Sequence, residues 1–167
     1  MLHLKSIDKH NWEDTLNLTL NEEQKKSIAP NVYSLAQVQF LDMAVAKGIY
    51  LDTRMIGFAV YGIDEDDGEC WIYRLMIDKN FQGKGYGKQA VHLLIDEFET
   101  IKAEHHQYIY ISYEPENNGA RFTYKNCGFV ETDLFVDGEQ VAKYAVKNKE
   151  QKGFKNTTQG IEGVKAK

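Results

Sequence analysis

The sequence is poor in cysteine and has no long apolar run, and each scarcity excludes a class of protein. Its 167 residues include two cysteines, Cys70 and Cys127, far apart and outside any C-x-x-C pair. We therefore expect reduced, structural thiols rather than a disulfide-built fold. No apolar run approaches the roughly 20 residues that a membrane-spanning helix needs.

Several functional signatures are also missing. The first residues, MLHLKSIDKHNWEDT, have no long apolar core and carry early acids, so we expect no signal peptide, no membrane partner and a cytoplasmic protein. There is no H-E-x-x-H and no G-x-S-x-G motif. The pair His105-His106 has no further ligands at metal spacing, which predicts a surface pair and no metal site.

Positive charge is scarce in most of the chain. The net charge is −5, and residues 147–167 contain six lysines and two glutamates, or +4, which leaves −9 for residues 1–146. We expect a single domain over 1–146 and a basic, flexible tail over 147–167. An acidic body argues against a nucleic-acid partner. It suits a cationic small molecule, with ordinary solubility as the alternative reading.

Periodicity predicts a mixed α/β (α+β) domain with no internal repeat or linker. The predicted strands cover 2–7, 48–63 as a pair turning at Asp52–Thr53, 70–78, 106–114, and 128–146 as a hairpin turning at Asp137-Gly138. The predicted helices cover 11–18, 21–28, 34–46, 85–101 and 118–126. The strand 70–78 is apolar on both faces, which is typical of a central strand.

The segment Gln82-Gly83-Lys84-Gly85-Tyr86-Gly87-Lys88 joins that strand to a helix. Glycines allow positive φ and close approach of a ligand to the backbone. Successive N–H groups and the helix N-terminus together favour an anion such as a pyrophosphate. Lys84 and Lys88 add charge at the rim. A glycine-rich turn without a ligand is the alternative.

Three known phosphate-binding patterns contain a glycine-rich loop of this kind. The dinucleotide fingerprint needs G-x-G-x-x-G, whereas the spacing here is G-x-G-x-G. A Walker A loop needs Ser or Thr after its lysine, whereas Gln89 follows Lys88. The pattern [QR]-x-x-G-x-[GA] matches throughout Gln82–Gly87.

This loop resembles the pyrophosphate loop of the GCN5-related N-acetyltransferases (GNAT), which bind acetyl-CoA. A second segment, Asn117-x-x-Ala120-x-x-x-Tyr124-x-x-x-Gly128-Phe129, is similar to that family's N-x-x-A-x-x-x-Y-x-x-x-G-F signature. The resemblance covers about residues 1–146. Within the family, WIYRLMIDKNFQGKGYGK (71–88), Glu22-Glu23-Gln24 and VDGEQV (136–141) resemble bacterial spermidine/spermine N-acetyltransferases.

The resemblance implies a GNAT fold and a set of cofactor contacts. The fold has a central, mostly antiparallel sheet with flanking helices, and acetyl-CoA binds at a splayed central strand. The implied cofactor-binding residues are Leu75, Met76, Ile77, Gln82, Gly83, Lys84, Gly85, Tyr86, Gly87, Lys88, Asn117 and Ala120. The Met76 region would supply the oxyanion donor.

The resemblance implies that Tyr124 is the general acid that protonates the leaving CoA thiolate, as a phenol with a pKa near 10 can do. Packing within the domain is the alternative for Tyr124, and helix capping is the alternative for Asn117. Polyamine enzymes often have an acid on the central strand where Tyr73 stands here.

Candidates for the general base or for ammonium binding are Glu22, Glu23, Glu69 and Tyr73. We expect the run Asp64–Asp67 to be solvated hairpin surface. Tyr108 and Tyr110, with Tyr113 nearby, either line an acceptor pocket by cation–π contact or pack in a core or interface.

We therefore expect an acetyl-CoA-dependent N-acetyltransferase for a small cationic amine, most readily a polyamine such as spermidine or spermine. The alternatives are a protein or aminoglycoside-like acceptor, and a CoA-binding sensor without turnover. Family analogy also suggests a homodimer through the C-terminal hairpin.

Overall fold

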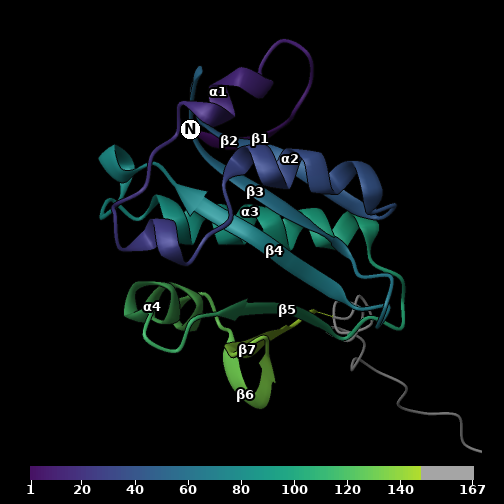
Figure 1. Ribbon diagram of the computed structural model, residues 1–167. Helices are drawn as coiled ribbons and strands as arrows, with labels where there is room; N and C mark the ends of the chain where they lie inside the picture. Colours follow the sequence, from purple (N-terminus) through teal and green to yellow (C-terminus); the bar gives the residue numbers. More distant parts are fainter. Residues whose placement is uncertain (148–167) are drawn as a thin grey trace, which may run out of the picture.

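The computed structural model describes residues 1–147 and shows one seven-stranded sheet with helices on both faces (Figure 1). The strand order is β1-β2-β3-β4-β5-β7-β6, and only β4 and β5 are parallel neighbours. The strands are β1 Leu2–Ser6, β2 Ala44–Leu51, β3 Arg54–Ile63, β4 Cys70–Ile77, β5 Tyr108–Tyr113, β6 Val130–Val136 and β7 Glu139–Ala145. The α-helices are α1 Trp12–Leu16, α2 Asn31–Gln37, α3 Tyr86–Ile101 and α4 Asn118–Asn126, and the 3-10 helices are η1 Gln24–Lys26, η2 Val38–Phe40 and η3 Lys79–Phe81.

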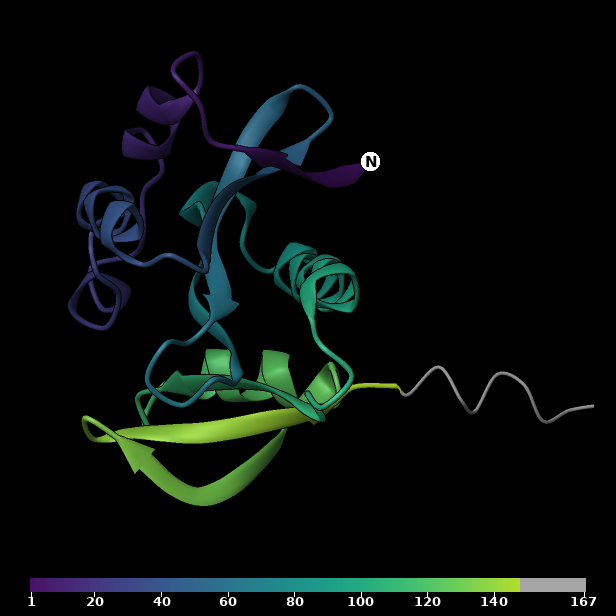
Figure 2. The same cartoon turned by 90° about the vertical axis from the view of Figure 1, so that its right-hand side faces the viewer.

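The two faces of the sheet carry different helices (Figure 2). The longest helix, α3, covers one face with a buried stripe of Ala90, Val91, Leu94, Ile95 and Phe98. This spacing of three and four residues forms one side of the helix that the sequence predicts over 85–101. The segment from α1 to η2 covers the other face over a smaller core of Phe58, Val60 and Met76. The sheet is thus the middle layer of three.

Strands β4 and β5 separate toward their carboxyl ends (Figure 1). They pair only where Cys70–Ile72 face Ile109–Ile111. Beyond Ile72, β4 pairs with β3 alone, and a bulge lies there because Tyr61 faces Ile72 while Val60 faces Arg74. A bulge increases local twist, which turns the rest of β4 away from β5. The sheet therefore opens at its centre.

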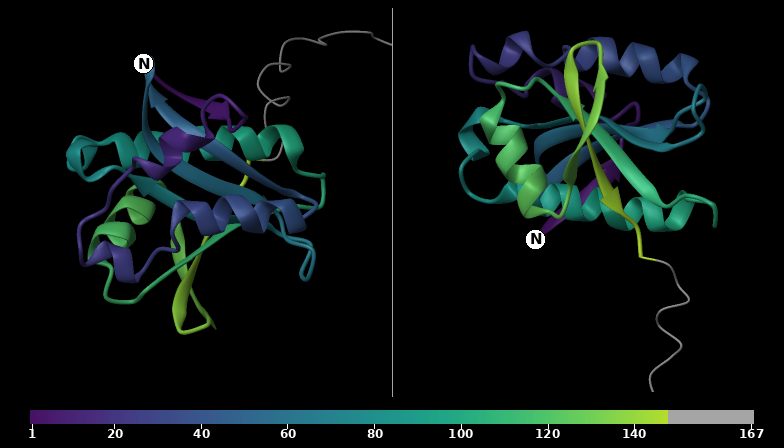
Figure 3. Two further views of the ribbon diagram at one scale, coloured as in Figure 1. Left: turned by 45° about the horizontal axis from the view of Figure 1, so that its top comes forward. Right: turned by 90° about the horizontal axis from the view of Figure 1, so that it is seen from below.

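The C-terminal hairpin and α4 stand beside this opening. Strands β6 and β7 form a hairpin whose turn, Asp137-Gly138, has positive φ at both residues, as expected for an Asp-Gly turn. Seen from below, the hairpin tip reaches toward the side of the sheet that carries α2 (Figure 3, right). The α-helix α4 follows β5 directly and so brings the second sequence signature to the open end of the sheet.

Three local predictions are wrong. The helix predicted over 34–46 ends at Gln37, and residues 44–46 belong to β2, because pairing with β3 overrides the apolar spacing of Leu41 and Val45. The helix predicted over 21–28 is only the 3-10 turn η1. His106 is buried, since its ring bonds the Ala103 N–H and the Gly68 carbonyl, whereas His105 is exposed as expected.

The described part of the chain has no disulfide, no helix that could span a membrane and no metal-binding cluster. Cys70 and Cys127 are buried and unpaired. Residues 1–147 contain no helix with the length and hydrophobicity that a bilayer crossing requires, and no cluster of three or more His, Cys, Asp or Glu side chains arranged to hold a metal ion. Of the tail predicted over 147–167, residues 148–167 lie outside the described residues.

Candidate active site

The glycine loop adopts the backbone that its composition predicts. Gly83 has φ +73° and Gly85 has φ +81°, and a Cβ added at either position would meet no atom within 4 Å. The conformation, rather than crowding, is what requires glycine at these two positions. Gly87 has an ordinary φ and lies near the Thr123 methyl group of α4. The loop therefore presents an open backbone surface at the start of α3.

The N–H groups of this loop are available to a ligand. The first helical hydrogen bond of α3 is donated by Gln89 to the Gly85 carbonyl at 3.2 Å. The N–H groups of residues 83–88 meet no acceptor within the described chain. Six free donors, three in the loop and three in the first turn of a 16-residue helix, suit a pyrophosphate, because the helix dipole adds partial positive charge there. Lys84 and Lys88 are exposed beside them. These residues fit the phosphates of acetyl-CoA.

Gln82 holds the loop in place through its side chain. Its Nε2 donates to the Ile77 carbonyl at 2.8 Å and to Gln24 Oε1 at 3.0 Å, while Gln24 Nε2 donates back to Gln82 Oε1 at 3.2 Å. This reciprocal amide pair joins the loop to η1. No local sequence pattern indicates that Gln24 and Gln82 pair.

Backbone N–H and carbonyl groups of β4 point alternately toward β3 and toward the opening. Asp78 N–H donates to Ile56 of β3, whereas the Ile77 carbonyl bonds the Gln82 side chain instead of β3. Because backbone groups alternate along a strand, those of Leu75 and Ile77 face the opening, and those of Met76 face β3. Met76 also buries its side chain in the core under α2.

A cavity of about 580 Å³ lies in the opening between β4 and β5. Residues from five parts of the chain line it: Ser27, Ile28, Ala29, Asp64, Asp66, Asp67, Trp71, Ile72, Tyr73, Arg74, Leu75, Ile111, Ser112, Tyr113, Glu114, Asn117, Ala120, Tyr124, Val136, Asp137 and Glu139. Six of these side chains are carboxylates and one, Arg74, is a cation. The cavity is therefore strongly acidic.

Neutral donors, not cations, hold these carboxylates. Four hydrogen bonds do so: Tyr73 to Asp64 at 2.9 Å, the Trp71 indole to Asp67 at 2.9 Å, Ser27 to Glu114 at 2.7 Å and Ser112 to Glu139 at 2.6 Å. None of the six cavity carboxylates takes part in an ion pair within residues 1–147. Four of the six are thus held in position, and the charge of all six is uncompensated.

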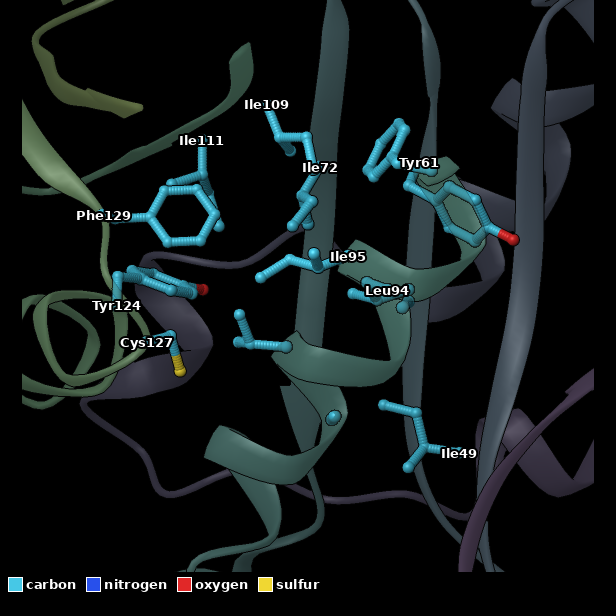
Figure 4. Close-up of a cluster of buried hydrophobic side chains, with 14 of the residues drawn as sticks. Ile49, Tyr61, Ile72, Leu94, Ile95, Ile109, Ile111, Tyr124, Cys127 and Phe129 are labelled. Carbon is cyan, nitrogen blue, oxygen red and sulfur yellow. The ribbon is translucent and has the colours of Figure 1, made fainter. Parts of the chain in front are cut away.

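Tyr124 lines the cavity from α4. Its ring packs against Tyr113 at 5.5 Å and Phe129 at 5.8 Å, and its hydroxyl points away from α4 toward Ile95 (Figure 4). Only 8% of the residue is exposed, and burial raises the pKa of its phenol. It is therefore a protonated donor at neutral pH. Asn117 caps α4, since its Oδ1 accepts from the Ala120 N–H at 3.0 Å.

The structure brings together only some of the predicted residues. Tyr73, Leu75, Asn117, Ala120 and Tyr124 share the cavity, while the loop 82–88 lies outside it at the end of β4. Glu69 does not line the cavity. Glu22 and Glu23 are exposed and also lie outside it, and Glu22 pairs with Lys25.

Of the predicted aromatic and acidic residues, some line the cavity and others pack elsewhere. Tyr113 lines the cavity, whereas Tyr110 stacks on Trp71 at 5.3 Å and Tyr108 packs under Lys143 at 4.2 Å. The prediction of a solvated surface is wrong for Asp64, which is half-buried and lines the cavity. Glu114 lies in no motif, and the VDGEQV segment that contains Asp137 and Glu139 does not by itself indicate a site, so only the fold brings these three acids together.

Comparison with known proteins agrees with this geometry. Residues 8–129 match the model of the Acetyltransferase (GNAT) family. The chain is 30% identical over 148 residues to the spermine/spermidine N(1)-acetyltransferase of Bacillus subtilis (strain 168), covering 84% of this chain and 95% of that protein.

Two solved structures share the fold. The spermidine N-acetyltransferase from Vibrio cholerae in complex with CoA and spermine has a TM-score of 0.65 at 20% identity, over 87% of this chain and 95% of that one. The ribosomal-protein-S18-alanine N-acetyltransferase from Escherichia coli has a TM-score of 0.62 at 17% identity, over 87% and 94%. The chain belongs to the GNAT family of N-acetyltransferases, which use acetyl-CoA as the acetyl donor.

Proposed function

We propose that this acetyltransferase acetylates a terminal primary amine of a polyamine such as spermidine or spermine. The observation that carries the proposal is the acidic cavity at the splayed strand, with six carboxylates, one guanidinium and no ion pair among residues 1–147 that satisfies those acids. Unpaired carboxylates attract ammonium groups strongly in a cavity with low-dielectric walls. The names of the bacterial relatives support the same acceptor class.

The distribution of the acids suits a substrate with several charges. Asp64, Asp66 and Asp67 come from the β3–β4 turn, while Asp137 and Glu139 come from the β6–β7 hairpin. These two groups lie on separate elements that line one cavity. An extended polyamine places ammonium groups at intervals along its length, so that one contacts each group. A monoamine satisfies only one of them.

The protein's own groups support acetyl transfer in three ways. Bound acetyl-CoA supplies the thioester whose carbonyl carbon the amine attacks. The open N–H of Leu75 or Ile77 on β4 stabilises the oxyanion, because backbone donors fixed before the reaction need no reorganisation. Tyr124 donates the proton that the leaving thiolate takes up. The loop 83–88 and the helix dipole of α3 anchor the phosphates.

The test is thiol release from acetyl-CoA against a panel of acceptors. The panel contains spermine, spermidine, diamines, a monoamine, an aminoglycoside, amino acids and a lysine-containing peptide. We expect the highest kcat/KM for spermine or spermidine. Preferential turnover of the peptide or of the aminoglycoside, with polyamines silent, would overturn the polyamine proposal and leave the acetyltransferase assignment intact.

A further inference from the structure

We propose that Tyr73 and Asp64 together accept the proton of the incoming ammonium group, with Tyr73 in contact with the amine and Asp64 behind it. The inference rests on the proposed function only in that the acceptor is an amine. A primary amine has a pKa near 10, so at neutral pH about one molecule in a thousand carries the lone pair that attack requires. An enzyme that binds the ammonium form therefore needs a proton acceptor at the site.

The geometry of the pair is fixed from both sides. The Tyr73 hydroxyl donates to Asp64 Oδ2 at 2.9 Å. The other carboxylate oxygen, Oδ1, accepts from the Asp66 N–H at 2.9 Å and the Asp67 N–H at 3.3 Å. Both side chains line the cavity. The turn thus holds the carboxylate, and the carboxylate orients the phenol.

The bulge in β4 explains why Tyr73 can occupy this place. In the pairing with β3, Ile72 and Arg74 have partners and Tyr73 has none. The Tyr73 ring packs against the core under α2 while its hydroxyl reaches the β3–β4 turn. Because β4 separates from β5 at the same point, Tyr73 lines the opening. Tyr73 thus stands on the splayed strand itself, two residues from Leu75, and Asp64 reaches it from the β3–β4 turn.

Tyr73 does not serve as a base alone. Burial, and then the hydrogen bond and charge of Asp64, raise the pKa of its phenol above the usual value. The hydroxyl is therefore protonated at neutral pH, and its oxygen accepts a proton only if its own proton leaves. Asp64 Oδ2, the hydrogen-bond acceptor of that proton, is the group that receives it. The sequence candidates Glu22, Glu23 and Glu69 do not line the cavity.

The proton transfers balance. The ammonium gives one proton to the Tyr73 oxygen as the Tyr73 proton passes to the Asp64 carboxylate, which leaves a neutral amine, an unchanged phenol and a carboxylic acid. Half-exposed Asp64 returns that proton to water. The amine lone pair then forms the C–N bond, and the C–S bond breaks with its electron pair on sulfur. The nitrogen loses its second proton to water through the same Tyr73–Asp64 pair, and Tyr124 regains from water the proton that it gives to sulfur, so the products are the amide, the CoA thiol and one net proton.

Other charged groups face the pair from each neighbouring element. Glu65, Asp66 and Asp67 lie on the same turn, and Arg74 follows Tyr73 on β4. Glu114 lies after β5, and Asp137 and Glu139 belong to the β6–β7 hairpin. Those that line the cavity set its field, whereas Glu65 lies outside it, and none of them bonds the Tyr73 hydroxyl. A change at Asp64 or Tyr73 should therefore alter the pH profile in a way that a change at the other groups does not.

The test compares Tyr73→Phe, Asp64→Asn and wild type by the pH profile of kcat/KM, on whichever amine of the panel wild type turns over fastest. We expect both variants to lose about 10²- to 10³-fold near pH 7, as for loss of a general base. Their kcat/KM should then rise about tenfold per pH unit toward pH 10, because only the free amine reacts. Wild type should show a flatter profile.

The matched control is Glu65→Gln, which removes one charge from the same turn, lies outside the cavity and keeps an acceptor for the Asp42 N–H. It should retain the wild-type profile. Equal stabilisation of all variants by acetyl-CoA in thermal melting would show intact folding. Variants with wild-type kcat/KM at pH 7, or with a uniform loss at every pH, would overturn the proposal. A wild type that prefers a non-polyamine amine overturns only the polyamine assignment.

Discussion

At the scale of single residues, the fold determines the protonation state of Tyr124. The sequence places it in a signature, and the structure places it in the cavity with Tyr113 and Phe129 around its ring. Burial raises the pKa of its phenol. A raised pKa means that Tyr124 stays protonated up to at least pH 10, so its ionisation produces no loss of activity below that pH.

Tyr124→Phe should therefore remove the proton donor and little else. We expect kcat to fall about 10²- to 10³-fold, with the affinity for CoA unchanged and stability altered by less than about 1.5 kcal/mol because the ring volume is kept. Steady-state kinetics, CoA calorimetry and thermal melting measure these three quantities. Unchanged kcat would remove Tyr124 from the mechanism, and a chain that binds CoA but never turns over in wild-type form would favour a sensor.

The sequence predicts only some of the side chains that line the cavity. Tyr124, Asn117 and Ala120 follow from a motif with fixed spacing, and the structure places them together. Asp64 was expected at the surface, because an acid in an Asp-rich turn gives no sign that Tyr73, nine positions later, bonds it. Glu114 and Glu139 join the cavity through tertiary packing, and the VDGEQV segment that contains Glu139 does not indicate that placement.

At the scale of elements, the glycine loop shows where a local pattern is enough. Strand, loop and helix follow in the predicted order, because backbone conformation at Gly83 and Gly85 depends on the residue itself. The helix predicted over 34–46 fails for the opposite reason. Its apolar spacing is compatible with a helix, but residues 44–46 pair with β3, and strand pairing is a long-range interaction.

Gly85→Ala tests the loop. The left-handed conformation costs an alanine about 1–2 kcal/mol, and a loop that relaxes to negative φ no longer directs its N–H groups at one anion. We expect CoA affinity to fall about tenfold, equivalent to about 1.4 kcal/mol, by calorimetry.

Gly138→Ala is the matched control. Its φ of +84° is close to the +81° of Gly85, and both positions have open space around a Cβ. It should cost similar stability and leave CoA affinity unchanged. Equal CoA affinities for the two variants would argue against the loop as the phosphate site.

At the scale of the whole molecule, the C-terminal hairpin presents an unpaired edge. Strand β6 is the last in the sheet, and Val130, Leu134, Phe135 and Val136 on it are exposed. Exposed apolar groups on an edge strand favour pairing with another chain, which supports the predicted homodimer as a proposal. Phe135→Glu should then shift the sedimentation mass from dimer to monomer at micromolar concentration, whereas wild type that sediments as a monomer would contradict it.

The central claim is that uncompensated carboxylates select a polycation. The most direct measurement is kcat/KM for spermidine and for butylamine, which offers a similar primary amine without the other charges, across ionic strength. We predict a large preference for spermidine at low salt that falls as salt is added, because screening weakens attraction between exposed charges. Equal kcat/KM for the two amines, or a preference that salt does not change, would contradict the account.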